Sequence, residues 1–471
     1  MLSQLHNRIM TETTIASGTI NLLNTVVGAG ILAMPFGLRQ NGLLFGSFLI
    51  LWSSLTSSFG LYLQNKVAKY TGQQGSVSYF SLSQLTYPQL SIVFDCAIAI
   101  KCFGVGVSYL VVIGDLMPKI MESVHVNPVS ILMTRNLWIT LFMLAIVIPF
   151  SYFKRMDSLK YTSVAALFSV GYLICLVVGH YLMNDVPVDG GEIVYNGPIS
   201  WKSTLLSLPI FVFAYTCHQN MFAIINELKS KESDGSQTRQ SNIIVRNAIS
   251  IACFSYLVVG IIGYLNFGDR VTGNIITLYP KDSVLSLIGR LCIVIMVAFL
   301  FPLQCHPCRG SINHVIHYLR KARLKSAATH TYTEVSSDGE SGHDVSDASL
   351  ISTTPLEGAE DFAGHYPITV KLTPRGFYII TTCILIFSYL LAISVSSLEH
   401  VLAFVGSTGS TSISFILPGL FGYFLIRPLN NATKLNAVEK FCKYGGLVLA
   451  IWGLVVMIVC LSATLFFNAS H

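Results

Sequence analysis

The sequence predicts an all-α polytopic membrane protein with about 11 transmembrane helices. Of its 471 residues, 52% are hydrophobic and only 11% are charged, whereas soluble domains carry about 25% charged residues. The apolar residues form 11 continuous runs, each near the length of about 20 residues that a helix needs to cross the hydrocarbon core. Continuous rather than alternating runs favour a helical bundle over a β-barrel, because a helix satisfies its own backbone hydrogen bonds in lipid.

The predicted spans follow a polar N-terminal tail, residues 1–14. No cleavable signal peptide is expected, because the first apolar run continues well past the length of a signal core. Spans one to eight fill residues 15–310, a cytosolic loop covers 311–374, and spans nine to eleven fill 375–471. The expected spans are 15–37, 43–64, 91–116, 136–152, 160–182, 204–226, 243–265, 284–306, 376–396, 400–425 and 445–467.

The long loop differs from the rest of the chain in composition. Between Ser326 and Val370 there is no lysine or arginine, and the stretch holds eight acidic residues among many serines and threonines. Such a segment cannot bury enough apolar surface to fold, so residues 326–366 are predicted to be disordered. Both a segment regulated by phosphorylation and a plain solvated tether fit this composition.

Lysine and arginine positions predict the orientation in the membrane. With the N-terminus in the cytosol, 21 of the 29 basic residues face the cytosol, seven face the other side, and Lys101 lies within a span. The seven are Arg39, Lys119, Arg135, Lys202, Arg270, Lys281 and Arg290. The N-terminus is therefore predicted to be cytosolic and, after an odd number of spans, the C-terminus lumenal. Because the net charge of +6 sits in these loops, no nucleic-acid partner is expected.

The cysteines and carboxylates give no sign of a metal site or an enzyme. Most of the 11 cysteines lie inside apolar runs, which is typical of small buried hydrophobic residues rather than of disulfides. The nearest approach to a metal motif is Cys305-His306-Pro307-Cys308, but no second ligand pair follows it. No paired carboxylates, metal-binding helix or nucleophile elbow is visible. We expect no cofactor and no enzymatic activity.

The first span carries the most informative polar pattern. Asn24 and Thr25 precede Gly28-Ala29-Gly30 at mid-depth, where lipid-facing helices avoid polar side chains. We expect the helix to break at these glycines and to resume near Ile31, with free N–H groups and a positive dipole end facing the break. Such an end suits a substrate carboxylate. The alternative is close helix packing through small residues; the polar residues on adjoining turns favour the break.

The sixth span repeats this theme, with polar side chains from Tyr215 to Asn220 in mid-membrane. Interrupted helices at matching positions of two halves indicate an inverted-repeat transporter. Spans one to five and six to ten would be the repeats, with the eleventh appended. The predicted substrate-binding residues are Asn24, Thr25, Val27, Gly28, Ala29, Gly30, Tyr215, Thr216, Cys217 and His218.

The motif Val-Val-Gly-Ala-Gly-Ile-Leu-Ala-Met-Pro-Phe, residues 26–36, resembles the first span of the amino acid/auxin permease family. Residues 101–118 and 213–222 are most similar to its fungal vacuolar branch, which is related to the sodium-coupled neutral amino acid transporters. The resemblance covers nearly all of the membrane portion. It implies a LeuT-like fold, secondary active transport of amino acids, and residence in a vacuolar or lysosomal membrane.

The coupling ion follows partly from the same resemblance. In the sodium-coupled relatives, sodium lies between span one and a hydroxyl-bearing residue of span eight, but residues 291–301 contain no serine or threonine. Because hard cations require oxygen ligands, we favour protons over sodium. Main-chain carbonyls can still hold Na⁺, so sodium coupling stays an alternative. Asn24, which matches the family's asparagine, can serve the fold or the substrate.

Three ionisable residues are candidates for proton coupling, because such residues inside a membrane are functional suspects by default. His218 lies beside the predicted break; its alternative is a neutral imidazole hydrogen-bonded to the unwound backbone. Lys101 can replace the missing cation electrostatically or pair with a carboxylate such as Glu227, which is the third candidate. The sequence leaves open which amino acids are bound and in which direction they move. It also leaves open a non-transporting amino acid sensor that uses the same cleft.

Overall fold

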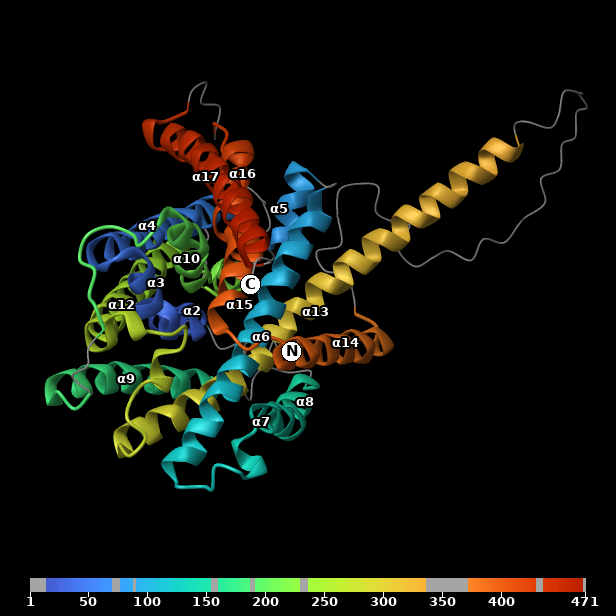
Figure 1. The fold of residues 1–471 in the computed structure, drawn as a ribbon. Helices are drawn as coiled ribbons and strands as arrows, with labels where there is room; N and C mark the ends of the chain where they lie inside the picture. Colours follow the sequence, from blue (N-terminus) through green and yellow to red (C-terminus); the bar gives the residue numbers. More distant parts are fainter. Residues whose placement is uncertain are drawn as a thin grey trace, which may run out of the picture.

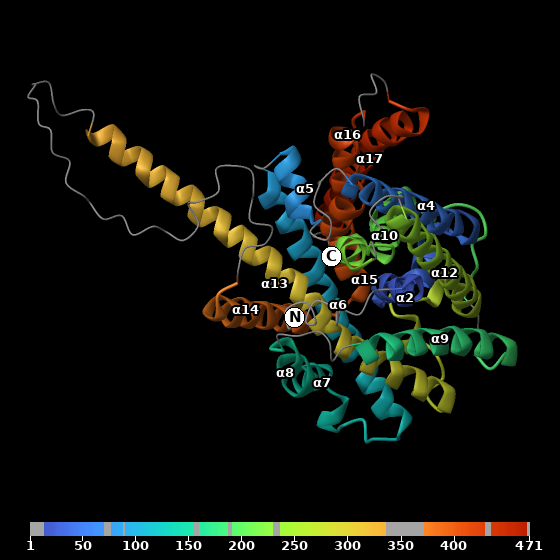
Figure 2. The same ribbon diagram turned by 180° about the vertical axis from the view of Figure 1, so that it is seen from behind.

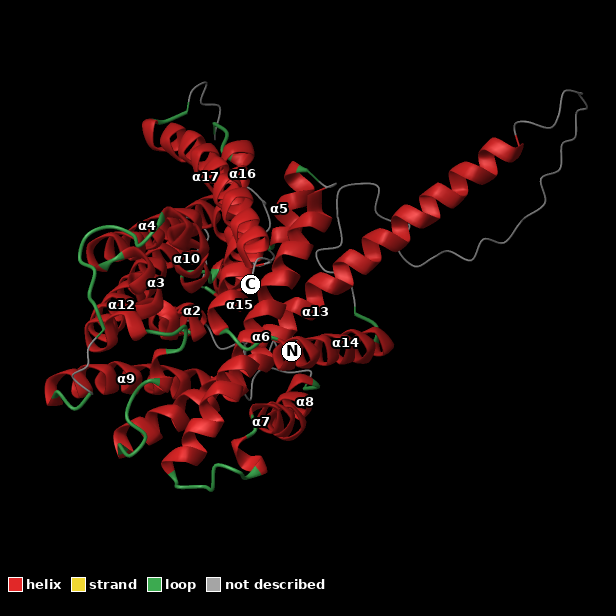
Figure 3. Ribbon diagram, in the orientation of Figure 1, coloured by secondary structure: helices red, strands yellow, loops and turns green. Residues whose placement is uncertain are grey.

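The computed structural model describes residues 14–69, 77–87, 90–153, 160–186, 191–228, 236–335, 372–428 and 435–468. Its regular structure within these ranges is helical, and no β-strand is found there (Figure 3). Most helices pack into one bundle around α6, Ser91–Ser123, which is buried along most of its length (Figure 1). This confirms an all-α polytopic membrane protein.

The first half of the bundle runs from α2 to α9. Its elements are α2 Ile15–Val26, η2 Ala29–Ala33, α3 Met34–Asn41, α4 Leu43–Ala68, α5 Tyr79–Thr86, α6, η5 Ile131–Met133, α7 Arg135–Phe142, η6 Met143–Val147, α8 Ile148–Ser151 and α9 Lys160–Met183. The second half contains α10 Trp201–Ala214, α11 His218–Glu227, α12 Ser236–Phe267, η8 Gly268–Arg270, η9 Ile275–Thr277, α13 Val284–Val335, α14 Pro374–Ser394, α15 Leu398–Val405, η10 Gly406–Ser410, η11 Ser412–Ile416, α16 Leu417–Leu425 and α17 Ala437–Asn468.

Each of the predicted spans coincides with helix, but they differ in length. Within the described residues, nine helices are long and apolar enough to cross a membrane, and α2 with the stretch Ala29–Asn41 forms a bent tenth span. The remaining range, Arg135–Ser151, is a shorter apolar helix with a π-helical turn at η6. The total of 11 and the two five-span repeats therefore stay predictions.

Helix α13 is longer than the sequence pattern indicates. Span eight was expected to end at residue 306, but the helix continues to Val335 and extends away from the bundle in both views (Figures 1 and 2). The first part of the predicted cytosolic loop is thus helical, including residues 326–335 of its acidic segment. Residues 336–371 lie outside the described residues, so the structure does not test the disorder predicted for them.

Small residues let α6 approach its neighbours closely, as is common between helices in membranes. A methyl group at Gly104 would clash with the side chain of Val405 in α15, and one at Gly106 would meet the ring of Phe301 in α13 at 2.9 Å. Helix α6 packs along α13 and also contacts α14, α15 and η10. The central helix therefore fixes the positions of the spans that surround the two interrupted ones.

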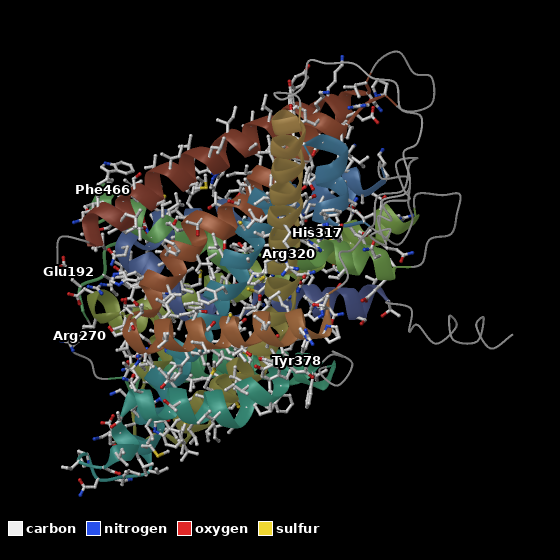
Figure 4. The ribbon with its side chains drawn as sticks, turned by 90° about the vertical axis from the view of Figure 1, so that its right-hand side faces the viewer. Glu192, Arg270, His317, Arg320, Tyr378 and Phe466 are labelled. Atoms are coloured by element: carbon white, nitrogen blue, oxygen red, sulfur yellow. The ribbon has the colours of Figure 1, made fainter. Side chains whose placement is uncertain are left out.

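The labelled residues in Figure 4 follow the predicted alternation of sides. Glu192, Arg270 and Phe466, which the span order places together on the predicted lumenal side, lie along one edge of the molecule (Figure 4). His317 and Tyr378, which it places on the predicted cytosolic side, lie farther across the molecule (Figure 4). The bundle thus has two distinct ends along the predicted membrane normal.

Candidate functional site

The first span breaks where the glycines predict. Helix α2 ends at Val26, and Val27 leaves the helical region with φ −85° and ψ 85°. Gly28 follows with φ −122° and ψ −141°, and the two parts of the span are bent by 47°. The chain resumes as a 3₁₀-helix at Ala29 and as a regular α-helix at Met34. The restart is therefore more gradual than the α-helix expected near Ile31.

The glycines of the break also make close contacts, so both alternatives considered for this motif are present. A methyl group at Gly30 would lie 2.9 Å from Cα and 3.0 Å from Cβ of Ala214 in α10. One at Gly28 would lie 3.2 Å from the Tyr109 hydroxyl of α6. The first break is consequently pressed against span six on one side and faces span three on the other.

The sixth span is interrupted at residues 215–217. Helix α10 ends at Ala214, α11 begins at His218, and the Thr216 N–H bonds the Phe213 carbonyl at 3.0 Å. The Thr216 hydroxyl donates to the Val212 carbonyl at 2.8 Å and accepts from Ser414 of η11 at 3.2 Å. Side-chain bonds thus replace part of the missing helical ladder, and span ten supports the break.

The two interruptions lie side by side and are joined directly. Asn220 donates from Nδ2 to the Thr25 hydroxyl at 2.8 Å, and this hydroxyl donates to the Asn21 carbonyl at 3.0 Å. Helix α11 also packs on α2, and α10 packs on η2 and α3. The structure therefore brings the predicted segments of spans one and six together; Asn220, which completes the link, was not among the predicted site residues.

Two further spans contribute residues that the sequence patterns did not single out. The Tyr256 hydroxyl of α12 lies 2.8 Å from the carbonyl oxygen of Val26 and 2.8 Å from that of Ala214, the last residues before the two breaks. The Ser57 hydroxyl of α4 donates to the Tyr215 carbonyl at 3.0 Å. Both residues bond to main-chain carbonyls of distant segments, which the sequence does not reveal. The one signal for them in the sequence is a polar side chain inside an apolar span.

His218 is fully buried and bonded to the backbone of span two. Its Nε2 lies 3.2 Å from the Ser57 carbonyl oxygen, and because a carbonyl only accepts, this nitrogen carries a proton. Its Nδ1 has no hydrogen-bond partner among the described atoms. Gln64 donates to the His218 carbonyl at 3.5 Å and to the Tyr79 hydroxyl. Burial raises the pKa of the Tyr79 phenol well above its ordinary value, so this acceptor stays neutral.

Lys101 lies deep in α6 with 2% of its surface exposed. Within the described residues it makes no hydrogen bond or ion pair. A methyl group at Gly409 of η10 would meet the main-chain nitrogen of Lys101 at 2.7 Å. Glu227, the last residue of α11, is exposed. No ion pair joins Lys101 to Glu227 in the described part of the chain. Of the three proton-coupling candidates, His218 lies at a break, Lys101 is buried in the central helix, and Glu227 is exposed.

Asn24, Val27 and Ala29, the other predicted residues of the first break, are also buried. The Oδ1 atom of Asn24 has no hydrogen-bond partner within the described chain. A buried acceptor without a partner costs about 1–3 kcal/mol. The Asn24 amide oxygen, one turn before the break, is therefore available to accept a hydrogen bond from a ligand or to coordinate an ion.

Side-chain contacts hold two parts of α6 against other elements. Asp95 lies at hydrogen-bond distance, 3.2 Å, from Nδ1 of His314 in α13, at the predicted cytosolic end. Asp115 pairs with Arg135 of α7 at 3.6 Å, and Arg135 also donates to the Val395 carbonyl at 2.8 Å. No group of three metal-ligating side chains occurs among the described residues. Both aspartates of α6 therefore bond to neighbouring elements, and Lys101 stands apart from them.

Comparison with known proteins identifies the family. The family model described as transmembrane amino acid transporter protein matches residues 11–459. The chain belongs to this family. It is 46% identical over 458 residues to vacuolar amino acid transporter 6 of Saccharomyces cerevisiae, covering 96% of this chain and 99% of that protein.

Two further relatives are less similar to this chain. Vacuolar amino acid transporter 5 of Schizosaccharomyces pombe is 40% identical over 450 residues, which cover 95% of this chain and 93% of the relative. Sodium-coupled neutral amino acid transporter 7 of Danio rerio is 26% identical over 299 residues, 62% of each chain. These matches confirm the predicted resemblance to the amino acid permeases and to their fungal vacuolar branch, and the relatives are named as transporters rather than enzymes.

Proposed function

We propose that this protein is a secondary active amino acid transporter of a vacuolar, lysosome-like membrane, coupled to protons. Its substrate binds between the unwound segments of spans one and six. The observation that carries the proposal is the junction of two interrupted helices, linked by Asn220 and Thr25 and by Tyr256. Neighbouring breaks of this kind are where inverted-repeat transporters bind substrate.

The breaks offer complementary charge to the two groups that all amino acids share. Helices α2 and α10 direct the negative ends of their dipoles, with the carbonyls of Val26 and Ala214, toward the junction. The N–H groups that open η2, at Ala29 and Gly30, have no partner within their own helix. A substrate ammonium suits the carbonyls and a substrate carboxylate suits the N–H groups. This recognition selects amino acids as a class.

Proton coupling is supported by residues rather than by the relatives' names. Span eight carries no hydroxyl side chain over residues 291–301, so a sodium site there would lack that oxygen ligand. His218 opens α11 directly after the second break and is fully buried, and Lys101 is buried in the central helix α6. Glu227 remains a weaker candidate because it is exposed at the end of α11.

The vacuolar membrane is supported by the names of the yeast relatives, which match nearly the whole chain. The distant sodium-coupled relative matches only 62% of it. On this basis, and on the excess of basic residues on one side, we place the N-terminus in the cytosol and the C-terminus in the lumen.

Flux into proteoliposomes tests the proposal. Purified protein is reconstituted, and uptake of labelled amino acids is measured with the interior made acidic or alkaline relative to the medium. We expect uptake that depends on the pH gradient and persists when Na⁺ is replaced by N-methylglucamine. Collapse of uptake on that replacement would identify sodium coupling. Saturable binding without flux under either gradient would identify a sensor instead of a carrier.

A further inference from the structure

The position of Tyr256 is not explained by packing alone. Its side chain is fully buried in α12, and its ring meets that of Tyr215 edge to face with centroids 5.0 Å apart. Its hydroxyl lies 2.8 Å from both the Val26 and the Ala214 carbonyl oxygens. One phenol thus touches the last residue of each half-helix, at the point where both spans break.

The chemistry of this contact is unbalanced. Two carbonyls at negative helix ends converge on a hydroxyl that has a single proton, so at most one of them can receive a full hydrogen bond from it. The Val26 carbonyl also accepts from the Gly28 N–H at 3.0 Å in a tight turn. Among the described residues, Tyr256 is the only side chain that bonds either carbonyl. The Tyr256 hydroxyl therefore satisfies the Val26 and Ala214 carbonyls only in part. A positively charged group with several N–H donors would satisfy both of them better.

An amino acid's ammonium group is such a group, with three donors and a full charge. Resting on the proposed function, we infer that the Tyr256 hydroxyl stands in for the substrate ammonium when the carrier is empty. It bonds the Val26 and Ala214 carbonyls while the empty carrier returns. When an amino acid binds, the substrate ammonium replaces the hydroxyl at these carbonyls. Tyr256 is then a positioning residue for the two breaks.

If Tyr256 has this role, it should affect net transport and exchange of amino acids differently. Net transport requires the empty carrier to return across the membrane, whereas exchange of one amino acid for another uses only the loaded carrier. Without the hydroxyl, the loaded carrier keeps its ammonium contacts, but the empty carrier leaves two buried carbonyls less well satisfied. Removing the hydroxyl should therefore slow net transport more than exchange.

The test compares these modes in Tyr256→Phe, which conserves the ring. Liposomes loaded with a labelled amino acid that the wild type carries are diluted into medium with no amino acid, for net efflux, or with excess unlabelled substrate, for exchange. We expect the ratio of exchange to net efflux to rise about 3- to 10-fold over wild type, the rate equivalent of one hydrogen bond. An unchanged or lower ratio would overturn the inference.

A matched control lies on the same helix. Tyr264 is also buried in α12, and its hydroxyl accepts from the Val194 N–H at 2.9 Å, away from the breaks. Tyr264→Phe should keep the wild-type ratio of exchange to net efflux. A rise as large as that of Tyr256→Phe would mean that the loss of any tyrosine hydroxyl from α12 produces the effect, and would contradict the inference.

A second measurement applies even if the variant transports too slowly to assay. Thermal unfolding of the purified protein is followed with and without saturating amino acid. Tyr256→Phe should lower the Tm of the empty protein more than that of the saturated protein, so that the ligand-induced rise in Tm exceeds the wild-type value. An equal fall in both states would overturn the inference. A wild type that shows neither exchange nor net efflux would instead reject the proposed function.

Discussion

At the scale of single residues, the glycines of the first break differ in what they tolerate. A methyl group at Gly30 meets the backbone of Ala214 at 2.9 Å, which cannot rotate away, whereas one at Gly28 meets only the tip of Tyr109 at 3.2 Å. We expect Gly30→Ala to cost about 1–3 kcal/mol in the closed packing of spans one and six and to abolish most uptake. Gly28→Ala should retain most of it, in the same proteoliposome assay.

The control for these variants is Gly171→Ala, in the interior of α9, where the added methyl group meets no atom within 4 Å. It should transport like the wild type, and its abundance in the membrane should match that of Gly30→Ala. Equal uptake by Gly28→Ala and Gly30→Ala would show that contact with Ala214 does not limit transport.

The bond between Thr25 and Asn220 is a second feature at this scale. If it couples the two breaks, then Thr25→Val and Asn220→Ala should each reduce uptake, and the double variant should lose little more than either one. We expect a coupling of about 0.5–3 kcal/mol from the double-mutant cycle on uptake rates. Combining Thr25→Val with Thr140→Val, whose hydroxyl bonds Tyr389 far along the chain, should give additive effects. Additivity in the first cycle would refute the coupling.

At the scale of elements, span ten joins spans three and six through backbone contacts in its π-helical segments. A methyl group at Gly406 would clash with the Pro209 carbonyl oxygen, and one at Gly409 would meet the main-chain nitrogen of Lys101 at 2.7 Å. Gly406→Ala must therefore displace α10 or η10, and we expect a loss of stability of about 1–3 kcal/mol, measured as a lower Tm in detergent. Gly310→Ala, which meets nothing within 4 Å, should keep the wild-type Tm.

The elements also show what the sequence could and could not predict. The break at Gly28 and Gly30 could be predicted, because glycines next to polar side chains at mid-depth are unfavourable in a continuous helix that faces lipid. The role of Tyr256 could not be predicted, because its hydrogen-bond partners are main-chain carbonyls of two other spans. His218 was predicted to lie beside the break, but its partner could not be predicted, because that partner is the main-chain carbonyl of Ser57 in another span. The extension of α13 to Val335 was missed because hydropathy marks where a helix leaves the membrane, not where it ends.

At the scale of the whole molecule, the side reached by the C-terminus depends on one short element. The described residues contain nine long spans and one bent span, and ten crossings would leave both termini on the same side. Only if Arg135–Ser151 also crosses does the C-terminus lie opposite the N-terminus. At about 1.5 Å per residue, its 17 residues reach about 26 Å, slightly less than a hydrocarbon core of about 30 Å.

We expect this element to cross, because a short span is accommodated by local thinning of the bilayer and by snorkelling of its flanking residues. Arg135 begins it, and Lys154 and Arg155 follow it in the sequence. Crossing also maintains the excess of basic residues on one side through all later loops. In sealed vesicles with the cytosolic face outward, protease should remove an N-terminal epitope and spare a C-terminal one until detergent is added. Loss of both epitopes before detergent would place Arg135–Ser151 on one side and reverse the orientation of every later span.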